Sequence, residues 1–423
     1  MPRQHSVTNA GGKTTTLLLW IIAGVVTGAL AYQRYHGAVS GSVGADFSIY
    51  LKAAREVAAG HSPYQPDQLF VYPPPFALLL APFSHLSAAH LWKPWTALEL
   101  VALVAGVAAF VAAEAPRLAS WLRPVLFVAC TASVLHFWPV TIGLFLGQSD
   151  AFVFVALTFS TLAAARAWLA SRGILIGVAG LLKAWPAAVG LSLFQRGLDR
   201  RRRTMVAALL TFFAAPVLAL AVGGGSGLVA SVKAIVAART QNRLVSDSAW
   251  GVPSLLFSHS GLARPVAASV PLLVVATAVL VGWVLGLLVL ALRTEGDPQM
   301  CTWNVTFCLV LLLPVSHLAY TLYALPVLWV WGARVLRNRP WDLREVAVLA
   351  VLVLWWLVQT KSWPDSGSSA AISSIRYSVV FAADLVACTA SVLGARFVLG
   401  SEAAATGPEG VPGAALGLVA QAN

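Results

Sequence analysis

One short stretch near the N-terminus combines an acid, two bases and aromatic residues in a pattern suited to chemistry at a membrane surface. Asp46 lies at the start of the segment ADFSIYLKAAREVAAGHSPY, which follows the first long apolar run. A carboxylate at such a place is suited to act as a general base that deprotonates an attacking hydroxyl group. Asp is also a favoured helix N-cap, so a capping role for Asp46 is the alternative interpretation.

Further polar residues in the chain are suited to bind a phosphate group. Cations stabilise a leaving phosphate as its negative charge grows. The candidate ligands of a phosphate or of its sugar are Lys183, His317, Arg239, Arg243 and Gln148. The residues expected to bind an acceptor or to shape the loop after Asp46 are Tyr50, Lys52, Arg55, Tyr64 and Tyr72.

The composition indicates a helical membrane protein. The chain has 423 residues, of which 59% are hydrophobic and only 10% are charged, and its mean hydropathy is +0.79. A soluble domain has about 25% charged residues. The four cysteines lie in apolar runs and indicate neither a disulfide framework nor a metal cluster. No nucleotide-binding fingerprint is present, and we expect no cofactor and no nucleic-acid partner. The sequence does not indicate a metal site, and assistance by a divalent metal ion stays an open alternative.

We expect an all-α polytopic fold with about ten full spans, because a spanning helix needs about 20 apolar residues. The expected spans are 16–33, 88–113, 123–144, 150–168, 204–222, 267–292, 300–314, 317–333, 345–360 and 377–398. We assign residues 1–400 to one membrane domain. The tail over 401–423 is rich in Gly, Ala and Pro, and we expect it to be disordered and cytoplasmic.

The distribution of basic residues predicts the orientation in the plasma membrane. Lys and Arg gather in short connections, including the run Arg200 to Arg203, and such connections are typically cytoplasmic. The net charge of +12 therefore reflects topology rather than nucleic-acid binding. Both termini are then cytoplasmic. The segments expected on the outer side are 34–87, which contains Asp46, 223–266 and 361–376.

One segment breaks the simple alternation of spans. Arg172 and Arg196 both belong on the cytoplasmic side, yet the segment between them is too short for two spans at about 1.5 Å per residue. Its middle holds Lys183 and the helix breaker Pro186. We expect two half-helices that return to the same side, with Lys183 at the tip facing a polar cavity. The alternative is one tilted span in which Lys183 reaches the membrane surface.

The run ADFSIYLKAAREVAAGHSPYQPDQLFVYPPPFALLLAPF resembles the first outer loop of glycosyltransferase family 87. It has an Asp followed by aromatic residues, and it ends in YPP with an apolar run closed by Pro. The later segments LGQSD, LLKAWP and LLPVSHLAYTLYALP resemble family motifs in the same order, so that the resemblance covers about residues 40–335. Members often have Trp before the His that matches His317, whereas Ser316 stands there in this chain.

The resemblance implies a GT-C fold and an inverting sugar transfer on the periplasmic side, with Asp46 as the catalytic base. It implies a polyprenyl-phosphate sugar donor, most often mannose, and a glycolipid or lipoglycan of the cell envelope as acceptor. The family also contains enzymes that transfer arabinofuranose, and the sequence does not discriminate between the two sugars.

A transporter or flippase of a lipid-linked saccharide is the alternative from another functional class. Transporters typically have inverted repeats and a site at the membrane midplane, and no repeat of fixed period is visible in the sequence. Single residues have alternative roles as well. Lys183 is equally suited to pair with a buried acid, and His317 to lie in the core. Arg239 and Arg243 fall in a predicted loop, and a solvated surface position is their alternative role. Asp150 is interpreted as a helix cap.

Overall fold

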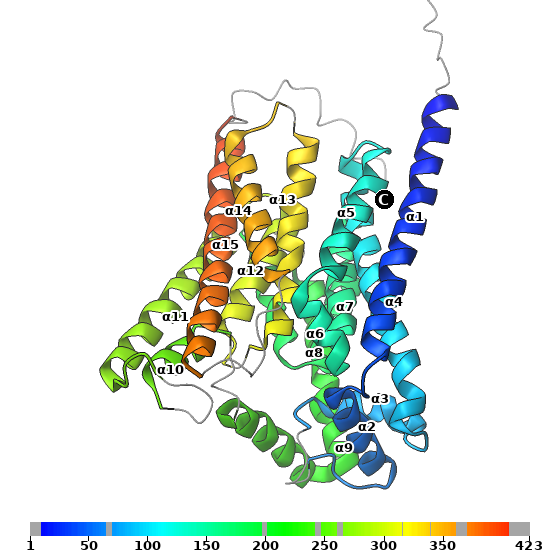
Figure 1. Ribbon diagram of the computed structural model, residues 1–423, viewed down its shortest axis with the longest axis vertical. Helices are drawn as coiled ribbons and strands as arrows, with labels where there is room; N and C mark the ends of the chain where they lie inside the picture. Colours follow the sequence, from blue (N-terminus) through cyan, green and yellow to red (C-terminus); the bar gives the residue numbers. More distant parts are fainter. Residues whose placement is uncertain are drawn as a thin grey trace, which may run out of the picture.

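The structure is a computed structural model, and within its described residues it consists of helices with no strand (Figure 1). The described residues are 10–64, 70–196, 201–241, 247–259, 265–314, 316–338, 340–360 and 370–405. In chain order the elements are α1 (Ala10–Val39), α2 (Ala45–Ala58), α3 (Pro74–Leu80), the short 3-10 helix η1 (Ala81–Phe83), α4 (Ala88–Glu114), η2 (Ala115–Arg117), α5 (Leu122–Leu135), α6 (Trp138–Leu146), α7 (Asp150–Ala165), α8 (Leu169–Leu182), η3 (Trp185–Phe194), α9 (Arg201–Gln241), α10 (Gly251–Phe257), α11 (Val270–Arg293), α12 (Pro298–Leu312), η5 (Leu318–Ala324), α13 (Leu325–Arg337), α14 (Leu343–Gln359) and α15 (Ala370–Ala405).

Five helical segments in the described part of the chain are long and apolar enough to cross a membrane. They are Thr14–Val39, Ala88–Arg117, Val270–Arg293, Leu318–Arg337 and Tyr377–Leu399. The bent pair of α5 and α6 gives a sixth if it is counted as one span. A polytopic membrane protein is confirmed, but the expected number of about ten full spans is not. Helices such as α7 and α12, with 16 and 15 residues, are shorter than a hydrocarbon core about 30 Å thick at about 1.5 Å per residue.

The expected span 123–144 is broken into two helices. The axes of α5 and α6 differ by 61°. Phe137, which lies between them, has an extended backbone, and Pro139 follows in the first turn of α6. Proline has no N–H to continue the hydrogen bonds of α5, so a new helix begins at this point. The turn that follows α6 is thereby directed toward α2.

The chain reverses direction at Lys183, as the position of the two flanking arginines predicts. Lys183 has an extended backbone after α8, and η3 leads back. The Arg172 guanidinium donates a hydrogen bond to Thr302 Oγ1 at 3.2 Å, and the Arg196 N–H donates one to the Leu292 carbonyl at 3.0 Å. Because α11 ends and α12 begins at these contacts, both ends of the hairpin lie at the same end of the bundle.

Two glycines allow α8 and α9 to pack closely and in parallel. A Cβ atom on Gly177 would lie 2.5 Å from Thr211 Cβ and 2.9 Å from the Ala208 carbonyl oxygen. Gly173, one turn earlier in α8, lies against the backbone of Thr204, which is one turn earlier in α9. Residues further along α8 therefore contact residues further along α9, so the two helices run in the same direction. The segment η3 returns the chain from the end of α8 toward the start of α9.

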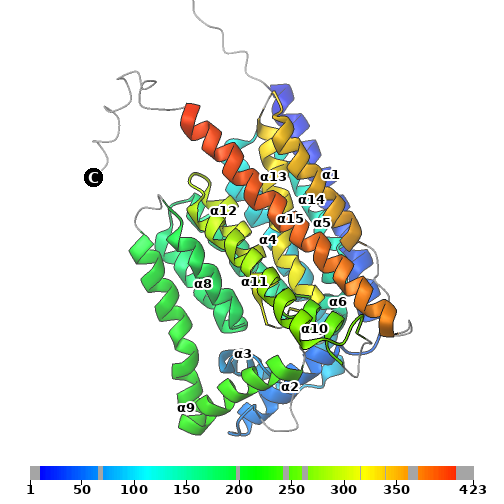
Figure 2. The same ribbon diagram turned by 90° about the vertical axis from the view of Figure 1, so that its left-hand side faces the viewer.

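The long helix α9 differs from the expected topology of its region. It continues to Gln241, so the first part of the expected outer segment 223–266 is helical. Figure 2 shows that this second part of α9 turns across the end of the molecule that holds α2 and α3. Arg239 therefore belongs to a helix rather than to a loop, although its side chain lies outside the described ones. Arg243 lies outside the described residues altogether.

The start of α1 and the end of α15 lie at the same end of the bundle (Figure 1). Arginines of the connections at this end form ion pairs with acids of the connection between α11 and α12. Arg117 pairs with Asp297 at 3.1 Å, and Arg196 pairs with Glu295 at 3.0 Å. Helix α15 continues to Ala405, inside the segment 401–423 that we expected to be disordered. The remainder of that segment lies outside the described residues.

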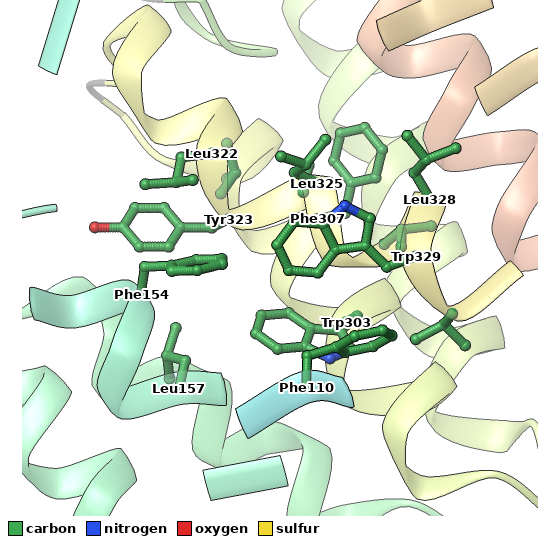
Figure 3. Close-up of a cluster of buried hydrophobic side chains, with 14 of the residues drawn as sticks. Phe110, Phe154, Leu157, Trp303, Phe307, Leu322, Tyr323, Leu325, Leu328 and Trp329 are labelled. Carbon is green, nitrogen blue, oxygen red and sulfur yellow. The ribbon is translucent and has the colours of Figure 1, made fainter. Parts of the chain in front are cut away.

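A large apolar core joins α4, α7, α12 and the segment of η5 and α13 (Figure 3). The ring of Trp329 lies 5.3 Å from that of Phe110 and 5.8 Å from that of Phe154. The ring of Tyr323 packs at the edge of this cluster, and Figure 3 shows its hydroxyl group at the end that points away from Phe307. The core therefore holds this hydroxyl group in a fixed position near the start of α7.

We predict that Gly177→Val destabilises the protein by about 1–3 kcal/mol, because the new side chain has no space between α8 and α9. Gly286→Val in α11 is the matched control, because a Cβ atom there meets nothing within 4 Å. Thermal unfolding of both purified variants in detergent measures the difference. An unfolding midpoint for Gly177→Val that equals that of the control would contradict the close packing of the two helices.

Candidate active site

A glycine turn brings the α6–α7 connection against the start of α2. Gly147 has a φ of +70°, a left-handed conformation that L side chains rarely adopt. A Cβ atom there would also lie 2.6 Å from the Trp92 ring and 2.8 Å from Phe47 Cβ. Glycine is thus required both for the turn and for the close approach. As a result, Gln148 lies next to Asp46.

Asp46 lies in the first turn of α2 and faces this connection. Its Oδ2 atom accepts a hydrogen bond from Gln148 Nε2 at 2.7 Å. The N-cap position of α2 is Gly44, so the capping interpretation of Asp46 is wrong. Burial raises the pKa of Asp46 above its ordinary value, while the hydrogen bond from Gln148 and the charge of Lys183 oppose the rise. A carboxylate with a raised pKa is a stronger base.

Lys183, at the tip of the hairpin, forms a buried ion pair with Asp150. Its Nζ atom lies 2.6 Å from Asp150 Oδ1, and the two residues are only 4% and 3% exposed. The Tyr323 hydroxyl donates to the same oxygen, and the ammonium lies 4.0 Å from the centre of the Tyr320 ring. The structural role for Lys183 is therefore confirmed. The interpretation of Asp150 as a cap is wrong, because its carboxylate binds Lys183 at the start of α7.

His317 precedes η5 and lies beside the same group of residues. Its ring contacts that of Tyr320 edge-on, with 5.5 Å between the ring centres. Burial, together with the nearby charge of Lys183, lowers the pKa of His317 to about 4. The imidazole is therefore neutral at physiological pH. It can donate one hydrogen bond and accept another, but it adds no positive charge.

The tyrosines after Asp46 connect the outer loop to Lys183. The Tyr50 hydroxyl donates to the Tyr72 hydroxyl at 2.7 Å, and the Tyr64 hydroxyl donates to the Tyr72 carbonyl at 2.7 Å. The centre of the Tyr72 ring lies 5.7 Å from Lys183 Nζ. These three tyrosines therefore hold the loop against the hairpin tip.

The two bases that follow Asp46 in α2 lie on its exposed face. The Arg55 guanidinium donates hydrogen bonds of 3.0 Å to the carbonyl groups of Ser84 and Leu86, which ties α2 to the turn after η1. Lys52 is exposed on the same helix. The structure therefore separates Lys52 and Arg55 from the group formed by Asp46, Gln148 and Lys183.

Sequence reasoning overlooked two residues of this region. Tyr323 donates to Asp150, and Glu99 of α4 lines the same small pocket as Gln148 and Asp150 although it is only 1% exposed. A single acid inside an apolar run was the available signal for Glu99, because such residues in membrane helices are typically functional. Within the residues that the structure describes, no group of three or more His, Cys, Asp or Glu side chains is arranged to hold a metal ion.

The arrangement is suited to transfer a group from a phosphate to a hydroxyl. Asp46 provides a partly exposed base, and Lys183 provides a buried cation that is close enough to lower the pKa of Asp46. A base activates the attacking hydroxyl, and a cation stabilises the phosphate that leaves.

Comparison with known proteins agrees with this chemistry. The family model described as glycosyltransferase family 87 matches residues 70–316. The matched segment begins after Asp46 and ends immediately before His317, and it includes Gln148, Asp150 and Lys183. No curated protein matches the chain. Because the family model covers more than half of the residues, the chain belongs to glycosyltransferase family 87.

Proposed function

We propose that this protein is an inverting GT-C glycosyltransferase of the plasma membrane. It moves a mannosyl residue from polyprenyl-phosphate mannose to a hydroxyl group of a glycolipid or lipoglycan of the cell envelope. Membership of the family supports glycosyl transfer. The observation that supports the mechanism is the position of the Asp46 carboxylate, which Gln148 holds within electrostatic range of the buried Lys183 ammonium.

In the proposed reaction, Asp46 accepts the proton of the acceptor hydroxyl group. At the same time, the oxygen of that hydroxyl group attacks the anomeric carbon of the donor sugar. The bond from that carbon to the donor phosphate breaks on the opposite face, so the configuration inverts. The bonding electrons remain on the phosphate, whose negative charge increases. Lys183 stabilises this charge, and the neutral imidazole of His317 donates a hydrogen bond to the same phosphate.

Asp150 allows Lys183 to act as a cation inside the membrane domain. An isolated buried ammonium loses its proton or costs several kcal/mol, whereas a paired one keeps its charge. The ammonium has three N–H donors, of which Asp150 takes one and Tyr320 takes another. Asp150 therefore holds Lys183 charged and in place, and the remaining donor serves the phosphate.

The proposed orientation places Asp46 on the periplasmic side. Figure 2 shows the start of α9, which is rich in arginine, and the connection between α11 and α12 away from the end of the molecule that holds α2 and α3. Arg117 and Arg196 pair with Asp297 and Glu295 of that connection. Short basic connections are typically cytoplasmic. Both termini then lie in the cytoplasm, and the acceptor reaches Asp46 from the periplasm.

The donor is tested with purified protein, membrane glycolipids and three sugar donors supplied separately. We expect transfer from polyprenyl-phosphate mannose, with inversion at the anomeric carbon seen by NMR of the product. Transfer only from the corresponding arabinofuranose donor would change the sugar but not the mechanism. Transfer from a nucleotide sugar without any lipid phosphate would contradict the proposed donor class.

We predict that Asp46→Asn lowers the transfer rate by roughly 10²–10⁴-fold, because the amide cannot accept the proton of the acceptor. Glu56→Gln is the matched control, since Glu56 lies in the same helix and pairs instead with His61. The raised pKa of Asp46 also predicts that the wild-type rate falls as the pH drops through a value above that of an ordinary Asp. Steady-state rates across pH measure both effects.

A stable Asp46→Asn variant with full activity would exclude Asp46 as the base. A variant that retains reduced activity and the wild-type pH profile would exclude it as well, because another group would then be titrating.

We predict that the ion pair can be removed without loss of the fold but not without loss of donor binding. Lys183→Met alone leaves Asp150 buried without its cation, which destabilises the protein by about 3–5 kcal/mol. The double variant Lys183→Gln with Asp150→Asn replaces the pair by neutral amides and should recover most of that stability. Its kcat/KM for the donor should still fall by about tenfold or more, because the phosphate that leaves has lost its cation.

Thermal unfolding and donor kinetics of the single and double variants are compared with those of the wild type. A double variant that is stable and has an unchanged kcat/KM for the donor would show that Lys183 serves the fold alone.

A further inference from the structure

A buried arginine in the first turn of α8 has fewer partners than its charge and its donors call for. The Arg172 side chain is only 3% exposed. Its guanidinium group has five N–H donors, of which one binds Thr302 Oγ1 at 3.2 Å. In the described part of the chain no carboxylate pairs with it. Buried charges are normally paired with an opposite charge, so this group has both the charge and the donors to bind an anion.

A second polar side chain lies on the same side of α12. Gln299 precedes Thr302 by three residues, so the two residues share one face of the helix. The Gln299 side chain is 4% exposed, and neither atom of its amide has a hydrogen-bond partner among the described residues. The face of α12 that contacts Arg172 therefore offers the Gln299 amide N–H group as a further donor to an anion.

The position of Arg172 along α8 indicates the source of the anion. Trp168 directly precedes α8 and is 59% exposed, as is typical of aromatic residues at a membrane interface. Arg172 follows about one turn later. The arginine run that begins α9 lies beside this turn, because a Cβ atom on Gly173 would lie 2.1 Å from the carbonyl oxygen of Thr204 (Figure 2). Basic pockets between helices at the cytoplasmic interface attract anionic lipid head groups.

We propose that Arg172 and Gln299 bind the phosphate group of an anionic phospholipid in the cytoplasmic leaflet. The guanidinium group binds two phosphate oxygens side by side, and the Gln299 amide donates to the same phosphate. The negative charge of a phosphodiester balances the charge of Arg172. The exposed arginines at the start of α9 add attraction for a lipid with net negative charge. A phosphate held here joins α8 to α12 at the base of the hairpin, away from the tip that holds Lys183.

The test compares two arginines that carry the same charge near the same interface. Arg172→Gln removes the buried guanidinium group. Arg166→Gln is the matched control, because Arg166 is exposed in the connection just before α8. Both variants and the wild type are stripped of lipid in a neutral detergent. Their unfolding midpoints are then measured during titration with phosphatidylglycerol, phosphatidylcholine or inorganic phosphate, since a ligand of the folded state raises the midpoint.

We expect phosphatidylglycerol to raise the midpoint of the wild type and of Arg166→Gln with the same apparent Kd. For Arg172→Gln this Kd should be about tenfold higher or more, because the charged donors are lost. Without lipid, Arg172→Gln should unfold at or above the wild-type temperature, since a buried cation without a counter-charge has been removed. Equal Kd values for the two variants, or an equal effect of phosphatidylcholine, would overturn the proposed site.

The third ligand and a third variant complete the test. A midpoint that rises as much with inorganic phosphate, and only while Arg172 is present, would confirm the phosphate site but overturn the lipid as its source. Gln299→Leu keeps the arginine and removes the amide, so its Kd for phosphatidylglycerol should also rise. If Arg172→Gln does not fold, an unchanged Kd for Gln299→Leu overturns the proposal.

Discussion

The buried pair of Lys183 and Asp150 is the interaction on which the rest of the site depends. An ammonium within the membrane domain is stable only beside a carboxylate, and this requirement fixes the tip of the hairpin to the first residue of α7. Gln148 lies two residues before Asp150 and binds Asp46. One ion pair therefore sets the position of the cation, of the connection before α7 and, through Gln148, of the base in α2. The Tyr323 hydroxyl donates a hydrogen bond to the Asp150 carboxylate of this pair, and the large apolar core holds the Tyr323 ring in place.

Glycine and aromatic residues make this arrangement compatible with close packing. Gly147 permits the turn that places Gln148 beside α2, and Gly177 permits the contact of α8 with α9 that supports the hairpin. The Tyr50 and Tyr72 hydroxyl groups then fasten the outer loop near Lys183. The polar groups of the site are thus positioned by elements that have little freedom to move, which is what stabilisation of a developing charge requires.

Sequence patterns predicted the parts of the structure that depend on neighbouring residues. Runs of apolar residues located the helices, and the short segment between Arg172 and Arg196 predicted the reversal at Lys183. The predicted number of about ten full spans is not confirmed, because a helix of 15 or 16 residues and a complete span have the same apolar composition. The partner of Lys183 was also missed. Asp150 is 33 residues away in the chain, and a helix start is equally typical of a capping acid. Only the packing of α7 against α8 distinguishes the two roles.

The two charged groups of the site differ in their access to solvent, and this difference matches a reaction between substrates from two phases. Asp46 is partly exposed in a loop helix outside the spans, where the sugar head group of the glycolipid or lipoglycan acceptor can approach. Lys183 is buried at the tip of the hairpin, and an apolar groove lies on the lipid-facing side between α8, η3 and the first part of α9. In the proposed reaction the acceptor therefore arrives from the aqueous side and the lipid donor from the membrane side. In this proposal the anomeric carbon lies between the two groups, so the acceptor head group stays in the aqueous layer and the donor chain stays in the bilayer while the bond forms.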